Sequence, residues 1–233
     1  MYIGIDVSKK HLDVNPFDAK PTRIPNTTHG IRPLITRLQA LLDRRAQLTD
    51  FQTQDTRRIQ QTHDAESKRL IKSHLDDLTR QRLLVDKKTR ALIASTPERH
   101  ARAQRLLPLS GFGAFTVAAL LGYLPELGAR DDRPITSLCG LAPWARDSGE
   151  HTGPREIHGG RASARRSLYM AALVASRHNH VLACFYQGLA KRGKPPKPAL
   201  TAVMRKLLCL ANRLLRDDGF QLQTPPKREP TAT

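Results

Sequence analysis

A serine within a short run of small and polar residues is the first candidate for chemistry. Ser148 lies in residues 144–153, WARDSGEHTG, which interrupt an otherwise helical pattern. Asp-Ser-Gly is typical of a tight turn, because Asp and Ser bond to their own backbone and Gly accepts a positive φ. The same hydroxyl could attack a phosphodiester if a base removed its proton and cations neutralised the charge on phosphorus. This segment alone leaves both interpretations open.

Three arginines follow the serine and could supply the neutralising charge: Arg155, Arg161 and Arg165. The last two are one turn apart at the start of a predicted helix, so they share a face. Arg near a helix N-terminus opposes the helix dipole, at a cost of a few tenths of a kcal/mol unless an anion is bound there. The placement therefore indicates phosphate binding. His151 and His158 are the candidate general bases, and neither has an obvious orienting partner.

Two further stretches are candidates for contact with phosphates. In LLPLSGFGAFTVAALL, Gly111 and Gly113 lie between two predicted helices, where they allow close approach of the backbone. The amides that open the second helix favour an anion. A structural corner is the simpler interpretation of this stretch, and only the charge of the chain favours nucleic acid. Arg205 and Lys206 lie within a later predicted helix, where such residues are ordinarily on the surface, and we assign them to the same interaction.

The amino-acid composition indicates which kind of molecule the protein binds. The chain has 233 residues, with 39 Lys and Arg against 21 Asp and Glu and a formal net charge of +18. Such an excess repels itself unless a polyanion is bound, so nucleic acid is the expected partner and salt should weaken its binding. No apolar run reaches the roughly 18 residues of a membrane span, and the N-terminal layout is not that of a signal peptide. We therefore expect no membrane association and a cytoplasmic location. Cys139, Cys184 and Cys209 are expected to be reduced core residues.

The elements that must position these residues fall into four segments. Residues 1–43 predict a small α/β piece, with strands near 3–7, 11–17 and 22–26 and then a helix. Residues 44–97 contain almost no Gly or Pro and predict a long helix pair or coiled coil, with a weak point at 60–68. Residues 98–218 predict a mainly helical domain, and residues 219–233 a disordered tail. The predicted fold class is α+β, mostly α.

Two strings resemble segments of the insertion-sequence one-ten family of transposases, which are bridge-RNA-guided recombinases related to pilin-gene invertases. YIGIDVSKKHLDV resembles the opening of their RuvC-like, ribonuclease-H-like domain. Residues 138–217, which begin LCGLAPWARDSGEHTGPREIHGG, resemble nearly all of their C-terminal serine transposase domain. The family's coiled coil and helix-hairpin-helix would then correspond to the segments between the two strings.

The resemblance also implies roles for individual residues. Ser148 corresponds to the catalytic serine, which attacks a DNA phosphodiester and forms a covalent phosphoserine intermediate. Asp6 corresponds to the first acid of a DEDD set whose carboxylates hold Mg²⁺, and two such ions can clamp a transferring phosphoryl group. The resemblance implies DNA and a structured guide RNA as partners, and the coiled coil favours a homo-oligomer.

The chain departs from the family between its first strand and its long helices. The family's Glu lies in a Glu-Ala-Thr-Gly strand and its further Asp pair in a Lys-Thr-Asp-x-x-Asp-Ala segment, and neither string occurs here. Residues 34–45, LITRLQALLDRR, run directly into the predicted coiled coil, as though half of the RuvC-like domain had been removed. Asp13, Asp18, Asp43 and Asp50 are nearby, but none has the matching context. Because Mg²⁺ sites commonly use at least a carboxylate pair with substrate phosphates, Asp6 alone is insufficient and the metal site is expected to be incomplete.

Two functions from different classes follow. The first is a DNA recombinase that uses Ser148 for strand exchange and is impaired by the loss of three of the four RuvC-like acids. The second is a non-catalytic, nucleic-acid-binding remnant that associates with a full-length transposase. Both predict affinity that falls steeply with salt. A covalent protein–DNA adduct that requires Ser148 would distinguish them.

Overall fold

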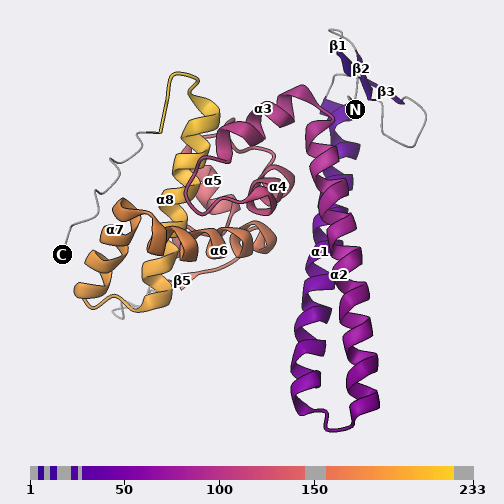
Figure 1. Ribbon diagram of the computed structural model, residues 1–233. Helices are drawn as coiled ribbons and strands as arrows, with labels where there is room; N and C mark the ends of the chain where they lie inside the picture. The colour runs from indigo at the N-terminus through magenta and orange to yellow at the C-terminus, as the bar shows by residue number, and fades with distance from the viewer. Residues whose placement is uncertain (1–4, 8–10, 15–21, 26–27, 145–155, 223–233) are drawn as a thin grey trace, which may run out of the picture. The chain divides into compact units, whose positions relative to one another are not determined.

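The computed structural model describes residues 5–7, 11–14, 22–25, 28–144 and 156–222. The chain divides into two compact units, residues 1–101 and 102–233, and each is described by itself. Figure 1 labels the helices and most of the strands of both units. The mostly helical character expected from the sequence is confirmed.

A small antiparallel sheet opens the first unit. Its strands are β1 (Ile5–Val7), β2 (His11–Val14) and β3 (Thr22–Pro25), in the order β1-β2-β3. All three lie within the segments predicted from alternating apolar residues. The register places Asp6 of β1 opposite Asp13 of β2. The ribonuclease-H-like identity of this sheet stays a prediction.

Two long helices form the rest of the first unit. Helix α1 (Thr28–Gln61) and helix α2 (Ala65–Ala94) are joined by residues 62–64, inside the predicted weak point. The Asp64 side chain caps α2 by accepting a hydrogen bond from the Ser67 amide at 2.7 Å. Helix α1 passes through residue 43, where the first predicted segment ended. Nothing interrupts the helix there, because residues 34–61 contain neither Gly nor Pro.

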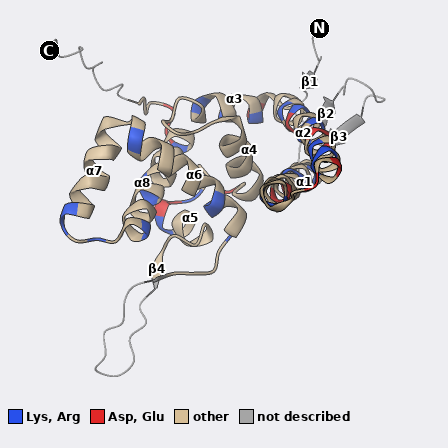
Figure 2. Ribbon diagram, turned by 60° about the horizontal axis from the view of Figure 1, so that its bottom comes forward, with Lys and Arg blue, Asp and Glu red and all other residues tan. Residues whose placement is uncertain are grey.

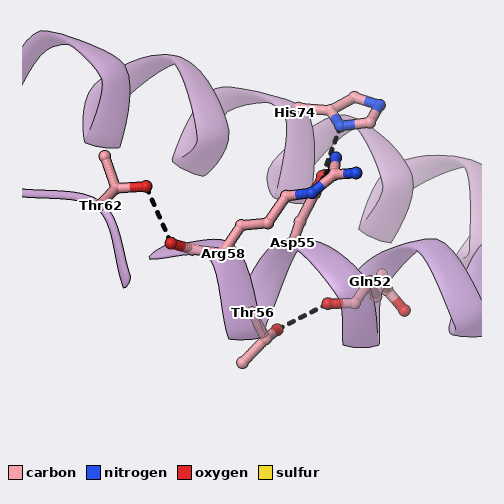
Figure 3. A network of polar contacts seen from close by, with 6 residues as sticks. All are labelled: Gln52, Asp55, Thr56, Arg58, Thr62 and His74. Carbon is pink, nitrogen blue, oxygen red and sulfur yellow. Dashed lines mark hydrogen bonds and ion pairs between the residues drawn. The ribbon is translucent and has the colours of Figure 1, made fainter. Parts of the chain in front are cut away.

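The interface between α1 and α2 alternates apolar contacts with polar ones. The less exposed positions of α2 recur after three and four residues, as in a heptad repeat: Ile71, Leu75, Leu78, Arg82, Val85, Thr89 and Leu92. Four polar contacts between described residues cross the interface: Arg44 to Gln81 at 3.2 Å, Arg45 to Asp86 at 2.6 Å, Gln52 to Thr79 at 2.8 Å and His74 to Asp55 at 2.6 Å. Figure 3 shows Asp55 between His74 of α2 and Arg58 of its own helix. The predicted helix pair is present, whereas self-association through it stays a prediction.

The second unit is built around helices. They are α3 (Pro97–Leu106), which begins in the first unit, α4 (Ala114–Tyr123), α5 (Asp132–Leu138), α6 (Ala162–His178), α7 (His180–Lys191) and α8 (Pro196–Arg216). Residues 116–122 of α4 are all buried, as expected for a helix that is apolar on every side. Helix α6 packs against α4, α7 and α8. The helices expected on both sides of residues 107–113 are present, and a helix-hairpin-helix function for them stays a prediction.

The buried side-chain amide of Asn212 connects α8 by hydrogen bonds to the start of α5 and the segment before it. Asn212 is fully buried; it accepts a hydrogen bond from the Gly128 amide at 2.7 Å and donates to the Arg130 carbonyl at 3.0 Å and to Asp132 at 2.7 Å. The three bonds satisfy a polar group that would otherwise be costly to bury.

The cysteines and the chain end differ in part from expectation. Cys139 is buried and burial raises the pKa of its thiol to about 12, whereas Cys184 is exposed, so the expectation of a core residue was wrong for Cys184. Helix α7 buries only Leu182 and Leu189, which leaves position 184 on its outer side. The ring of Phe220 lies 4.4 Å from the Arg213 guanidinium, and residues 223–233 of the predicted disordered tail lie outside the described residues. Among the described helices, none is both long and apolar enough to cross a membrane.

Candidate functional site

A two-stranded hairpin base brackets the segment that carries the candidate serine. Strand β4 (Pro143–Trp144) pairs antiparallel with β5 (Glu156–Ile157), with Pro143 opposite Ile157. The enclosed residues 145–155 lie outside the described part of the chain, and with them Ser148, His151 and Arg155. The structure therefore describes how the ends of this segment are held.

Three glycines lie directly beneath the hairpin base and form what we call the glycine junction: Gly140, Gly159 and Gly160. Their φ angles are +70°, +66° and +64°. A Cβ on Gly160 would lie 2.3 Å from the Gly140 amide nitrogen, and a Cβ on Gly140 would lie 2.3 Å from the Gly159 carbonyl oxygen. The Arg161 amide donates to the Leu138 carbonyl at 2.8 Å. The two chain segments that enter the hairpin are thus in direct backbone contact, which side chains at Gly140 and Gly160 would prevent.

Arg165 holds the glycine junction from the side of α6. Its Nη1 donates to the Gly159 carbonyl at 2.5 Å and to the Cys139 carbonyl at 3.3 Å. Guanidinium groups are well suited to such bridging, because they carry five donors in a rigid plane. The structure gives Arg165 a role in fixing the hairpin base; its predicted contact with phosphate stays a prediction.

Arg161 forms a bidentate ion pair with Glu126. Its Nη1 and Nη2 lie 2.5 Å and 2.7 Å from the two carboxylate oxygens, and Nη1 also donates to the Tyr123 carbonyl at 2.8 Å. The hydrogen bonds from Arg161 lower the pKa of Glu126, and those to Glu126 raise the pKa of Arg161. Arg161 at the N-terminus of α6 predicted an anion beside it. Glu126 supplies that anion from within the chain, so the unfavourable interaction of Arg161 with the helix dipole does not require a phosphate.

The two glycines before α4 have different surroundings. Gly111 has a φ of +84°, and a Cβ there would lie 2.2 Å from the Ala171 carbonyl oxygen. Its close approach is therefore to α6 of the same chain, which agrees with a structural corner. Gly113 is the N-cap of α4, is exposed, and has no atom within 4 Å of an added Cβ. Of the two, Gly113 is the one open to a ligand.

The remaining predicted cations lie on the surface of α8. Arg205 and Lys206 are both exposed. The Lys206 Nζ lies 4.3 Å from the centre of the Phe185 ring, a cation–π contact with α7. His158, the described candidate base, is exposed next to the glycine junction.

The structure describes the backbone of the acidic site expected around Asp6. Asp13 is the residue opposite Asp6 in the sheet, a pairing that the sequence argument did not anticipate. A hairpin centred near residues 8–10 would have indicated it. Two aspartates are fewer than the four acids of the DEDD set. The described residues contain no group of three His, Cys, Asp or Glu that could hold a metal ion.

Comparison with known proteins places the hairpin within a recognised type of domain. Residues 103–187, from α3 into α7, match the profile of the transposase IS116/IS110/IS902 family. The chain is 28% identical over 156 residues to the pilin gene-inverting proteins of Moraxella lacunata and Moraxella bovis, an alignment that covers 64% of this chain and 48% of each relative. It is 31% identical over 137 residues to the insertion element IS900 uncharacterized 42 kDa protein of Mycobacterium paratuberculosis, covering 55% of this chain and 33% of that protein. The chain spans about half the length of the pilin gene-inverting relatives.

Proposed function

We propose that this chain is a DNA-binding protein of the transposase and recombinase type, in which Ser148 is the nucleophile for strand exchange. The observation that carries the proposal is the match of residues 103–187 to the transposase family, because this range contains the hairpin, the glycine junction and Ser148. The similarity to proteins named for inverting a pilin gene supports recombination of DNA. The net charge of +18 supports a polyanionic substrate.

The glycine junction would contribute to this reaction through positioning. Attack by the serine Oγ forms an O–P bond while the bond from phosphorus to the leaving nucleoside oxygen breaks and that oxygen takes up a proton. A nucleophile gains most when it is held at the right approach to phosphorus. The junction and the Arg165 guanidinium fix both ends of the segment that carries Ser148. His151 and His158 remain the candidates to accept the serine proton.

We also propose that strand exchange by this chain is impaired. The support is the sequence, which lacks both strings that carry the family's other three acids. Mg²⁺ would assist phosphoryl transfer by neutralising developing charge. By the resemblance to the family, Asp6 would be one of its ligands. Two aspartates in register do not replace the set of four, so the metal site would be incomplete. A structured guide RNA and a second copy of the chain bound through α1 and α2 belong to the same proposal.

The role of Ser148 as nucleophile is tested by the formation of a covalent protein–DNA adduct. The protein is incubated with Mg²⁺ and a labelled DNA that carries a terminal junction, and adducts are separated on a denaturing gel. We expect Ser148→Ala to lower adduct formation by at least about a thousandfold, because removal of a nucleophile leaves only residual catalysis. Ser137→Ala is the matched control, since Ser137 is an exposed serine on α5. Equal adduct from Ser148→Ala would contradict the serine mechanism.

The missing acids favour a second candidate, a non-catalytic nucleic-acid-binding remnant that associates with a full-length transposase. Under this function, both the wild-type chain and Ser148→Ala bind DNA with strong salt dependence, and neither forms an adduct. Adduct from the wild-type chain alone would exclude it.

A further inference from the structure

Three consecutive helices of the second unit carry positive charge without any carboxylate. Residues 157–216, which contain α6, α7 and α8, include twelve Lys and Arg and no Asp or Glu. Figure 2 shows the Lys and Arg residues of these helices in blue. A stretch of this length without an acid cannot neutralise itself, so its cations must pair with other parts of the chain, with water or with a bound anion.

Several of these cations are already engaged. Arg161 pairs with Glu126 and Arg216 with Asp131, while Arg165 binds backbone carbonyls. Lys206 and Arg213 lie over aromatic rings. These contacts engage five of the twelve cations. Arg166, Arg177 and Arg205 are exposed on the helices, and the other four cations lie in the connection between α7 and α8.

Four cations are concentrated in that connection, which we call the cationic turn: Lys191, Arg192, Lys194 and Lys197. All four are exposed. Within the described part of the chain, no ion pair involves any of them; Arg192 donates its Nε to the Gly188 carbonyl at 3.1 Å. Four like charges within seven residues repel one another. A polyanion would remove this repulsion.

The backbone of the cationic turn is ordered by hydrogen bonds and prolines. The Gly193 amide donates to the Ala190 carbonyl at 2.9 Å and the Lys194 amide to the Leu189 carbonyl at 3.1 Å. With a φ of +77° at Gly193, these bonds form a Schellman motif at the end of α7. Pro195, Pro196 and Pro198 then restrict the chain. The backbone that carries the four cations is thus conformationally restricted, which lowers the conformational entropy lost on binding.

The helix dipoles explain only half of this charge. Lys191 and Arg192 complement the negative C-terminal end of α7. Lys194 and Lys197 lie at the positive N-terminal end of α8, where they are unfavourable without an anion. A solvated surface accounts for the first pair and not for the second.

We propose that the cationic turn is a second DNA contact of this protein, which binds the phosphate backbone independently of base sequence. The proposal rests on the proposed DNA function and deepens it, since the turn lies beyond residues 103–187 that match the transposase family. Lys and Arg contacts with phosphates position a protein on DNA without reading its bases. In this arrangement the turn anchors DNA while the hairpin contacts the reacting strand.

The test compares two variants of equal charge. In the turn variant, Lys191, Arg192, Lys194 and Lys197 are all changed to Gln. The control variant changes four exposed cations of the helix pair to Gln: Arg57, Lys72, Lys87 and Lys88. The dissociation constant for a fluorescent duplex of arbitrary sequence is measured by anisotropy over a series of salt concentrations. Circular dichroism and thermal melting establish that each variant is folded.

We expect the turn variant to bind at least about tenfold more weakly at physiological salt. The slope of log K against log salt should become shallower by about 0.9 for each phosphate that the protein no longer neutralises, or about 3 to 4 in total. The control variant should remain within about twofold of wild type in affinity and keep its slope. A double variant, Lys194→Gln with Lys197→Gln, should show about half the change in slope while preserving the Arg192 bond to Gly188.

An unchanged slope in the turn variant, or an equal loss of affinity in both variants, overturns the proposal. The same holds if an RNA hairpin competitor shows that the turn variant loses affinity for RNA and keeps its affinity for duplex DNA. These results are separate from the proposed function. A wild-type chain that binds no DNA would overturn the function itself, whereas a binding defect in the turn variant together with no Ser148 adduct would overturn only the nucleophile.

Discussion

The helix pair and the helices α6–α8 differ in how their charged residues are neutralised. In the helix pair, acidic and basic residues meet across the interface, as in the Arg45–Asp86 and His74–Asp55 contacts. Helices α6–α8 contain no acid, and among the described residues Arg161 and Arg216 pair with carboxylates from elsewhere in their unit. Charge neutralised within the chain serves structure, whereas charge left without a partner points to a ligand.

Buried polar groups differ between the same regions. Asp55 is buried, yet its partners are open to solvent, with side-chain exposures of 60% for His74 and 67% for Arg58. Asn212 is fully buried, and two of its three partners are backbone groups. Removal of the Asp55 carboxylate leaves His74 and Arg58, which can form hydrogen bonds with water. Removal of the Asn212 amide leaves backbone groups that the fold holds in place.

The largest expected effect is therefore at Asn212. Asn212→Leu keeps the branch of the side chain at Cγ and removes the hydrogen bonds to Gly128, Arg130 and Asp132. We expect a loss of about 3 kcal/mol in the free energy of unfolding, because two backbone groups and the Asp132 carboxylate lose their bonds to a fully buried amide. Urea denaturation followed by circular dichroism measures it.

The matched change in the helix pair is Asp55→Leu. Here we expect no loss, or a gain of about 1 kcal/mol, because an apolar residue in the interface replaces an ion pair whose other members return to water. Equal destabilisation by Asp55→Leu and Asn212→Leu would contradict the distinction between the two regions.

The next effect is at the glycine junction. Gly160→Ala places a methyl group against the Gly140 backbone, and we expect a loss of about 2 kcal/mol or more from strain at a site that cannot relax. Gly159→Ala is its control, because Gly159 has a similar positive φ and no atom within 4 Å of an added Cβ. It should cost only about 1 kcal/mol, from the backbone conformation alone. Thermal melting of both variants gives the difference, and equal losses would show that the junction is not tightly packed.

The smallest expected effect is at Glu126, and it depends on pH. The hydrogen bonds from Arg161 lower the pKa of Glu126 below its ordinary value of 4.5. The ion pair therefore stabilises the fold above that value and ceases to do so as the pH falls through the lower folded pKa. Glu126→Gln should cost about 1 kcal/mol near neutral pH, and this cost should disappear as the pH falls through the lowered folded pKa of Glu126. The exposed Asp76→Asn on α2 is the control, and a Glu126→Gln effect that persists in acid would contradict the ion pair.

Much of the fold could be predicted from the sequence because its signals are local. Alternating residues around Ile5 placed the first strand, and the near absence of Gly and Pro after residue 43 predicted the long helices. The exposure of Cys184 could not be predicted in this way. An apolar helical neighbourhood does not say which face of α7 packs against the rest of the unit.

Part of the candidate site could likewise be predicted from the sequence, and part could not. The types and spacing of Ser148, Gly159, Gly160, Arg161 and Arg165 made this segment a candidate site of chemistry from the sequence alone, and that role stays a prediction. Only the tertiary structure decided that Arg161 meets Glu126, that Arg165 holds the carbonyls of Gly159 and Cys139, and that Gly111 packs against α6. The physical reason is that an arginine's partner is set by which oxygen atoms folding brings near it. Residues as far apart in sequence as 126 and 161 become neighbours only when α6 packs in place.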